Sequence, residues 1–156
     1  MSARLIGSAP YFMVRDLGQA LDYYCDVLGF ARPRLWGEPP TFAMPQRDGF
    51  IVMLYQAENH TQLYSNGMQD GLWDAYFWVS DAEALFAEFC ARGAQVEYEP
   101  CVQHYEIKEF AVRDIDNHIL AFGQHWPLSQ GRTNVEGSAG GNNAGAGNTG
   151  ETDASS

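Results

Sequence analysis

The sequence of 156 residues is poor in basic residues, and it has no long apolar run. Nine Lys and Arg stand against twenty Asp and Glu, which gives a formal net charge of −11. Phosphate recognition needs clustered Lys and Arg, so we expect no nucleic-acid partner. No segment approaches the roughly 20 apolar residues that span a bilayer, and the first residues lack the apolar stretch of a signal peptide. We therefore expect a cytoplasmic protein without membrane contact.

Cysteine is also scarce. The three cysteines, Cys25, Cys90 and Cys101, are an odd number and lack the spacing of a metal site. Cys25 and Cys90 occupy apolar positions of two expected helices, where a buried thiol acts as a small hydrophobe. We expect all three to be reduced and structural.

A short pattern that is present twice indicates a duplicated module. Tyr-Phe-x-Val-x-Asp begins at Tyr11 and again at Tyr76. In both copies the Asp can cap an amphipathic helix that ends near a Gly. The spacing is longer than that of a solenoid repeat, so we expect two pseudo-symmetric halves of one domain, with any site formed between them.

Length and a hydrophobic content of 46% predict one domain over residues 6–126, divided into modules at 6–57 and 72–126. Each module has a βαβββ pattern. In the first, the expected strand, helix and further extended segments are at 11–14, 17–28, around Trp36, 41–45 and 50–56. In the second, the strand, helix and three strands are at 75–79, 82–92, 95–98, 108–112 and 119–123. Residues 129–156 are rich in Gly, Asn and Ser and are predicted to be a disordered tail, because burial could not offset the cost of ordering them.

Two longer segments carry a resemblance to a known family. They are Tyr-Tyr-x-x-Val-Leu-Gly-Phe at 23–30 and Lys-Glu-Phe-Ala-Val-Arg-Asp-Ile-Asp-Asn-His at 108–118. With the duplication, they resemble the vicinal oxygen chelate superfamily of glyoxalase I, extradiol dioxygenases, fosfomycin-resistance enzymes and bleomycin-resistance proteins. The resemblance covers residues 8–124 and implies an α+β fold whose two modules form curved mixed sheets around a cavity. One such scaffold carries many activities, so the fold alone does not determine the function.

Enzymes of this family hold a metal between the modules with His, Gln and Glu. The corresponding positions here are Ala9, Met53, Asp74 and Ala121, of which only Asp74 could bind a metal. A catalytic divalent site needs about three protein ligands. The four histidines do not pair at helix or strand spacing, which argues against a relocated site. We therefore expect no metal, no other cofactor and no catalytic residue.

Strand alternation directs an aromatic set toward the implied cavity. If Ala9 and Asp74 point inward, the intervening residues pack against the helices, namely Phe12, Val14, Phe77 and Val79. Together with residues at the rim, the predicted ligand-binding set is Tyr11, Met13, Trp36, Tyr55, Asp74, Tyr76, Trp78, His104, Tyr105 and Glu109. Either this set forms a binding surface, or its aromatic rings only fill a core.

Asp74 also has two interpretations. Among Tyr and Trp it favours a cationic ligand through its charge and through cation–π attraction of about 0.5–2 kcal/mol. Alternatively, it is a solvent-exposed residue at the start of a strand, and the net negative charge only maintains solubility.

Three functions are consistent with these patterns. The resemblance favours a metal-independent homodimer that binds a small molecule, a cationic and aromatic antibiotic or metabolite, as the bleomycin-resistance proteins do in antibiotic resistance. A second possibility is a glyoxalase- or dioxygenase-like enzyme with a non-standard or absent metal site, for which Glu109 and Tyr105 are the acid/base candidates. A third is an interaction module whose aromatic face is covered on dimerisation.

Overall fold

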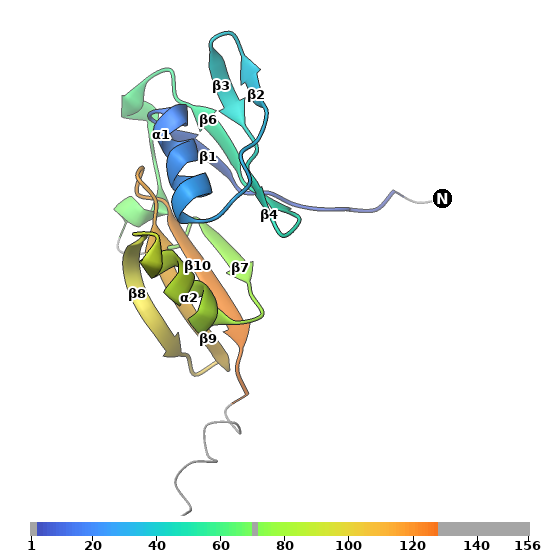
Figure 1. Cartoon of the computed structure of the whole chain (residues 1–156), viewed down its shortest axis with the longest axis vertical. Helices are drawn as coiled ribbons and strands as arrows, with labels where there is room; N and C mark the ends of the chain where they lie inside the picture. Colours follow the sequence, from blue (N-terminus) through green and yellow to red (C-terminus); the bar gives the residue numbers. More distant parts are fainter. Residues whose placement is uncertain (1–2, 70–71, 128–156) are drawn as a thin grey trace, which may run out of the picture. The chain divides into compact units, whose positions relative to one another are not determined.

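The first module forms a four-stranded mixed sheet, one helix and a small hairpin. The strand order is β1-β6-β3-β2, with β1 (Tyr11–Val14), β6 (Met53–Gln56), β3 (Pro40–Ala43) and β2 (Leu35–Gly37). The hairpin pairs β4 (Gln46–Arg47) with β5 (Phe50–Ile51). Helix α1 (Leu17–Asp22) begins at Asp16, whose side chain accepts a hydrogen bond from the Gln19 N–H, and it packs on the sheet (Figure 1).

The second module repeats this plan. Its elements are β7 (Ala75–Trp78), α2 (Ala82–Ala91), β8 (Gln95–Val102), β9 (Ile107–Arg113) and β10 (Ile119–His125). The strand order β7-β10-β9-β8 corresponds strand by strand to that of the first sheet. Asp81 caps α2 as Asp16 caps α1. The predicted α+β fold with two βαβββ modules is therefore confirmed.

The computed structural model describes residues 3–69 and 72–127, and the described residues up to Trp126 form one compact unit. The tail predicted at 129–156 lies outside the described residues. None of the helices within the described ranges is long and apolar enough to cross a membrane.

Two elements of the first module differ from the prediction. The α-helix expected over 17–28 ends at Asp22 and continues as a π-helical turn, η1 (Tyr23–Val27). This wider turn accompanies hydrogen bonds from two consecutive side chains to the second module, from Tyr23 to the Arg113 carbonyl and from Tyr24 to Asp114. The strand expected over 50–56 is divided, because its first residues pair with β4 and its last with β1 and β3.

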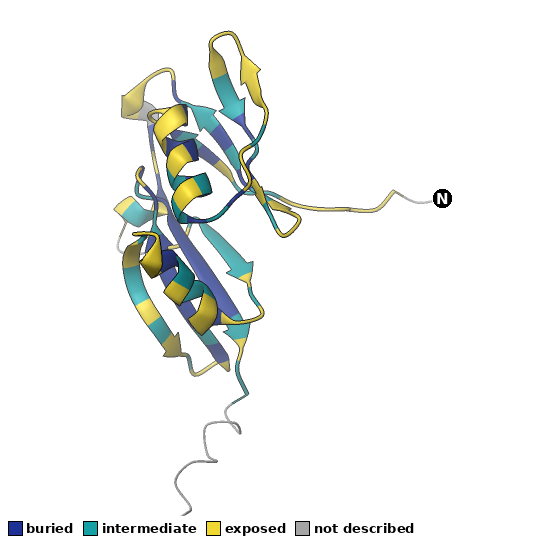
Figure 2. Ribbon diagram, viewed as in Figure 1, coloured by how far each residue is buried: buried dark blue, intermediate teal, exposed yellow. Residues whose placement is uncertain are grey.

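The apolar core lies between the helices and the sheets. Phe12 and Val14 are buried in it, and Phe77 and Val79 pack against it, as the alternation predicted. Figure 2 shows β10 buried along most of its length. All three cysteines are free, but the expected burial of Cys90 was wrong. Helix α2 turns Phe89 into the core, and the adjacent residue therefore points away from it.

A buried polar group joins the two modules. The Tyr24 hydroxyl donates to Asp114 Oδ2 at 2.9 Å, and the same oxygen lies 2.8 Å from His118 Nδ1. The His118 ring stacks on Phe12 with a centroid separation of 4.4 Å. The helix of one module is thereby linked to the last hairpin of the other.

Candidate functional site

The predicted ligand-binding residues of the first module gather on the sheet face opposite the core. The Tyr11 ring stacks on Tyr55 and Phe42, with centroids 6.2 and 6.3 Å apart. Trp36 lies 5.7 Å from Phe42, and Met13 is the register partner of Tyr55. Sequence reasoning missed Phe42, although its pairing with Tyr55 follows from the expected strand.

A second cluster forms on the corresponding face of the second module. The Tyr76 hydroxyl donates to Glu109 Oε2 at 2.9 Å, and the Tyr105 hydroxyl donates to Oε1 at 2.6 Å. The Tyr76 ring contacts Trp73 at 5.0 Å and Trp78 at 5.2 Å. The structure therefore brings three predicted residues, Tyr76, Trp78 and Tyr105, together with the carboxylate of a fourth, Glu109.

A glycine makes the bond between Tyr76 and Glu109 possible. Tyr76 is on the edge strand β7 and Glu109 is on β9, so the phenol must cross β10. Gly123 of β10 is the register partner of Glu109. A Cβ at this position would overlap the Tyr76 hydroxyl. The absence of a side chain at Gly123 therefore leaves the path across the sheet open.

The Glu109 carboxylate is buried, with 1% of the residue exposed, and it has no cationic partner among the described residues. Burial and the nearby Glu109 charge raise the pKa of Tyr76 well above its usual value, and they raise the pKa of Tyr105 to about 12. Both phenols are therefore protonated donors at neutral pH.

Tyr98 of β8 completes the surroundings of this carboxylate. Burial, followed by the Glu109 charge, raises its pKa, while the Trp73 indole lies beside it and opposes part of that rise. The Tyr98 hydroxyl is buried and lacks a well-formed hydrogen bond to any of the described residues. The sequence offered no signal for Tyr98. The pairing of β8 with β9 has irregularities on both sides of this residue, so strand alternation does not predict which face its side chain occupies.

Asp74 has a structural role that neither sequence interpretation included. Its oxygens accept hydrogen bonds from the backbone N–H groups of Asn66, Gly67 and Ile119, at 2.7, 3.3 and 2.8 Å. The carboxylate thus ties the segment between the modules to the start of β10. Its binding of a cation stays a prediction.

His104, the remaining predicted ligand-binding residue, lies at the margin of the second cluster, next to Tyr105. His104 is exposed, and its ring packs edge-on against Tyr105 at 5.0 Å. Across residues 3–69 and 72–127, no group of three or more His, Cys, Asp or Glu side chains is placed to hold a metal. The expectation that the protein works without a metal stays a prediction.

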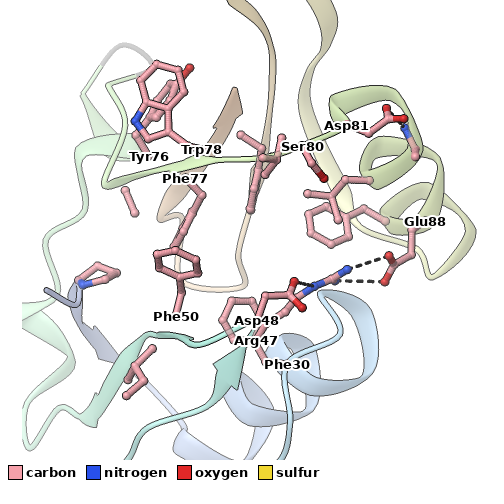
Figure 3. Close-up of a pocket in the computed structure, with 18 of the residues that line it drawn as sticks. Phe30, Arg47, Asp48, Phe50, Tyr76, Phe77, Trp78, Ser80, Asp81 and Glu88 are labelled. Atoms are coloured by element: carbon pink, nitrogen blue, oxygen red, sulfur yellow. Dashed lines mark hydrogen bonds and ion pairs between the residues drawn. The ribbon is translucent and has the colours of Figure 1, made fainter. Parts of the chain in front are cut away.

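A cavity of about 790 Å³ that the sequence did not indicate lies beside β7, between the β4–β5 hairpin and α2 (Figure 3). Phe50 and Phe77 point toward one another across it. At one side Arg47 donates to both Glu88 oxygens, at 3.1 and 2.8 Å. Two predicted ligand-binding residues line the cavity, namely Tyr76 and Trp78. Its size is within the range of small-molecule sites.

A second hollow of about 420 Å³ lies on the side of β1. Its lining includes Tyr11, Met13 and Asp74 from the predicted set, together with His118. Of the predicted residues, Tyr76 and Trp78 line the first hollow, whereas Tyr11, Met13 and Asp74 line the second.

Two curved modules with these aromatic faces define a member of the glyoxalase and bleomycin-resistance class of folds. The family model of the Glyoxalase/Bleomycin resistance protein/Dioxygenase superfamily matches residues 9–122. The chain belongs to this superfamily, and the resemblance stated from the sequence is confirmed. No curated protein matches the chain.

Solved structures agree with this assignment. TioX from Micromonospora sp. ML1 is 22% identical, with a TM-score of 0.61 over 76% of this chain and 99% of that chain. The bleomycin-binding protein from bleomycin-producing Streptomyces verticillus, complexed with copper(II)-bleomycin, is 22% identical, with a TM-score of 0.59 over 78% and 97%. A glyoxalase-related enzyme from Clostridium phytofermentans is 12% identical, with a TM-score of 0.63 over 79% and 97%. At these identities the likeness establishes the fold.

Proposed function

We propose that this protein binds and sequesters a small aromatic molecule without a metal. The observation that carries the proposal is the pair of aromatic sheet faces, one around Tyr11 and Tyr55 and the other around Tyr76 and Glu109. Three of the four positions that hold metal ligands in the family's enzymes are Ala9, Met53 and Ala121, whose side chains are poor ligands or none. Exposed aromatic rings supply stacking area for a flat ligand.

The proposal includes a cytoplasmic homodimer. Strands β1 and β7 are edge strands of their sheets, and each carries part of an aromatic face. An unpaired edge next to exposed rings is a surface that a second copy can cover. Such pairing would bring the aromatic face of one copy opposite that of another. We expect light scattering to report about twice the chain mass of 17.4 kDa, and a monomer would contradict this part.

Bleomycin is the first ligand to test, because one structural neighbour is a bleomycin-binding protein. The assay is a tryptophan-fluorescence titration with metal-free and copper-loaded bleomycin. Trp73 and Trp78 lie in the second aromatic cluster, whereas Trp126 lies under Lys108 on another part of the module. Free copper and N-acetyltryptophanamide control for quenching and absorption by the ligand. Binding would support a role in antibiotic resistance.

The expected result is saturable quenching at micromolar bleomycin that Tyr76→Ala weakens. The matched control is Ile115→Ala, because Ile115 is 40% exposed, lies on the turn between β9 and β10 and lines neither hollow. A flat titration would remove bleomycin from the proposal. Stoichiometric Zn, Mn, Ni or Fe in the purified protein, together with turnover, would instead favour the alternative of a superfamily enzyme.

A further inference from the structure

We propose that Glu109 recognises the charge of the bound ligand, and that the ligand carries an organic cation with N–H donors, an ammonium or an amidinium group. This inference rests on the proposed function and names the ligand class for the aromatic face of the second module. One of the two sequence interpretations gave cation binding to Asp74, whereas this inference gives it to Glu109.

Asp74 and Glu109 differ in the hydrogen bonds that their carboxylates already accept. Asp74 accepts three backbone hydrogen bonds and is committed to the fold. Glu109 accepts bonds from two neutral phenols, although a carboxylate offers about four lone-pair sites. An ionised carboxylate that is buried without a cation is costly. The bond from the Tyr105 hydroxyl to Oε1 is 2.6 Å long, within the range of charge-assisted O–H···O⁻ bonds.

The basic residues of the same strand are already paired. Arg113 binds Glu97 at 2.7 Å and donates to the Gly67 carbonyl. Lys108 points to the opposite side of β9, where it pairs with Glu83 and lies over the Trp126 ring. Neither of them compensates Glu109, which leaves this carboxylate open to a cation that a ligand supplies.

The surroundings of Glu109 provide an entry and further contacts. Tyr105 is 46% exposed and lies on the turn between β8 and β9, and its hydroxyl bonds only to Glu109 among the described residues. A ligand N–H can therefore take its place at Oε1. The Trp78 and Trp73 rings remain partly exposed beside Tyr76 and can stack on a cation.

The test compares two probes of nearly equal shape, 2-phenylethylammonium and the neutral 2-phenylethanol. Their affinities for the full chain are measured by NMR titration of the backbone and indole N–H signals. We expect the ammonium to bind roughly tenfold more tightly or better, the amount that a charge-assisted hydrogen bond supplies. Glu109→Gln keeps the shape and should abolish the preference. Glu58→Gln removes an exposed carboxylate elsewhere and should leave the preference unchanged.

Tyr105→Phe gives a second and opposite readout. The carboxylate loses its internal donor at Oε1, so the ammonium should bind more tightly than to the wild type, while the alcohol should not. Tyr105→Phe also tests the role of Glu109 if Glu109→Gln does not fold. In that case, an ammonium affinity equal to that of the wild type would overturn the inference.

The remaining outcomes separate this inference from the proposed function. Equal affinities of the two probes for the wild type overturn the role of Glu109 and leave a binding protein for neutral aromatics. An equal loss of preference in Glu58→Gln also overturns it, because net charge would then be the cause. If neither probe binds, both the inference and the proposed function for small aromatic ligands fail.

Discussion

The hydrogen bond between Tyr24 and Asp114 joins the two modules, and Tyr24→Phe removes it while keeping the aromatic ring. Tyr24 is fully buried, and its hydroxyl lies 2.9 Å from Asp114 Oδ2. Asp114 is also buried and has three further partners, each at 2.8 Å: His118 Nδ1 and the backbone N–H groups of Asp116 and His118. The substitution therefore removes one of four partners from a buried carboxylate and creates no large cavity.

The expected loss follows from that geometry. A hydrogen bond to a charged group contributes about 1.5–3 kcal/mol to the free energy of unfolding. Three partners remain, so the carboxylate is not left without hydrogen bonds. We expect Tyr24→Phe to lower the free energy of unfolding by about 1.5–3 kcal/mol.

Urea unfolding followed by circular dichroism measures this change. With a slope of about 1–3 kcal/mol per molar urea, the midpoint should fall by roughly 1 M at an unchanged slope. Tyr64→Phe is the matched control, because the same atom is removed from an exposed side chain and the change should stay within about 0.5 kcal/mol. A comparably small change for Tyr24→Phe would refute the idea that this bond couples the modules.

Two further predictions concern Gly123 and His118. Gly123→Ala should lower the free energy of unfolding by about 1–3 kcal/mol, because the new Cβ displaces the Tyr76 hydroxyl. This loss should be smaller when Tyr76 is also replaced by Ala. Equal losses with and without Tyr76→Ala would contradict the explanation. Burial lowers the pKa of His118, but the hydrogen bond and charge of Asp114 outweigh burial and raise it above 6.5. The resulting stabilisation is complete below about pH 6.5 and is lost as the pH rises through the folded-state pKa. The difference in unfolding free energy between wild type and His118→Gln should therefore shrink as the pH rises above about 6.5, and a constant or growing difference would count against this prediction.

The duplicated architecture could be predicted from the sequence because its signals are local. Asp16 and Asp81 each accept a hydrogen bond from an N–H three residues further along the chain. Alternation within β1 separates Tyr11 from the buried Phe12. Such patterns depend on neighbours within a few residues, which a sequence displays directly.

The roles of the acidic residues could not be predicted in the same way. Asp74 and Glu109 are both carboxylates near aromatic residues, and the sequence favoured Asp74 because of its position in the family pattern. Their difference comes from distant partners, since Ile119 reaches Asp74 and Tyr76 reaches Glu109. The split of the predicted 17–28 helix has a similar origin, because Tyr23 and Tyr24 both bond to the last hairpin of the chain.

The sequence by itself determined the two modules, the strand and helix order, the face that each β1 and β7 side chain occupies and the family. Only the tertiary structure decided which carboxylate accepts backbone hydrogen bonds, which one is buried without a cationic partner among the described residues, and where the cavity beside β7 lies. The physical reason is that strand alternation and helix capping act over a few residues. By contrast, desolvation and the completion of hydrogen bonds depend on groups that meet only when the β4–β5 hairpin, α2 and the β9–β10 pair have packed together.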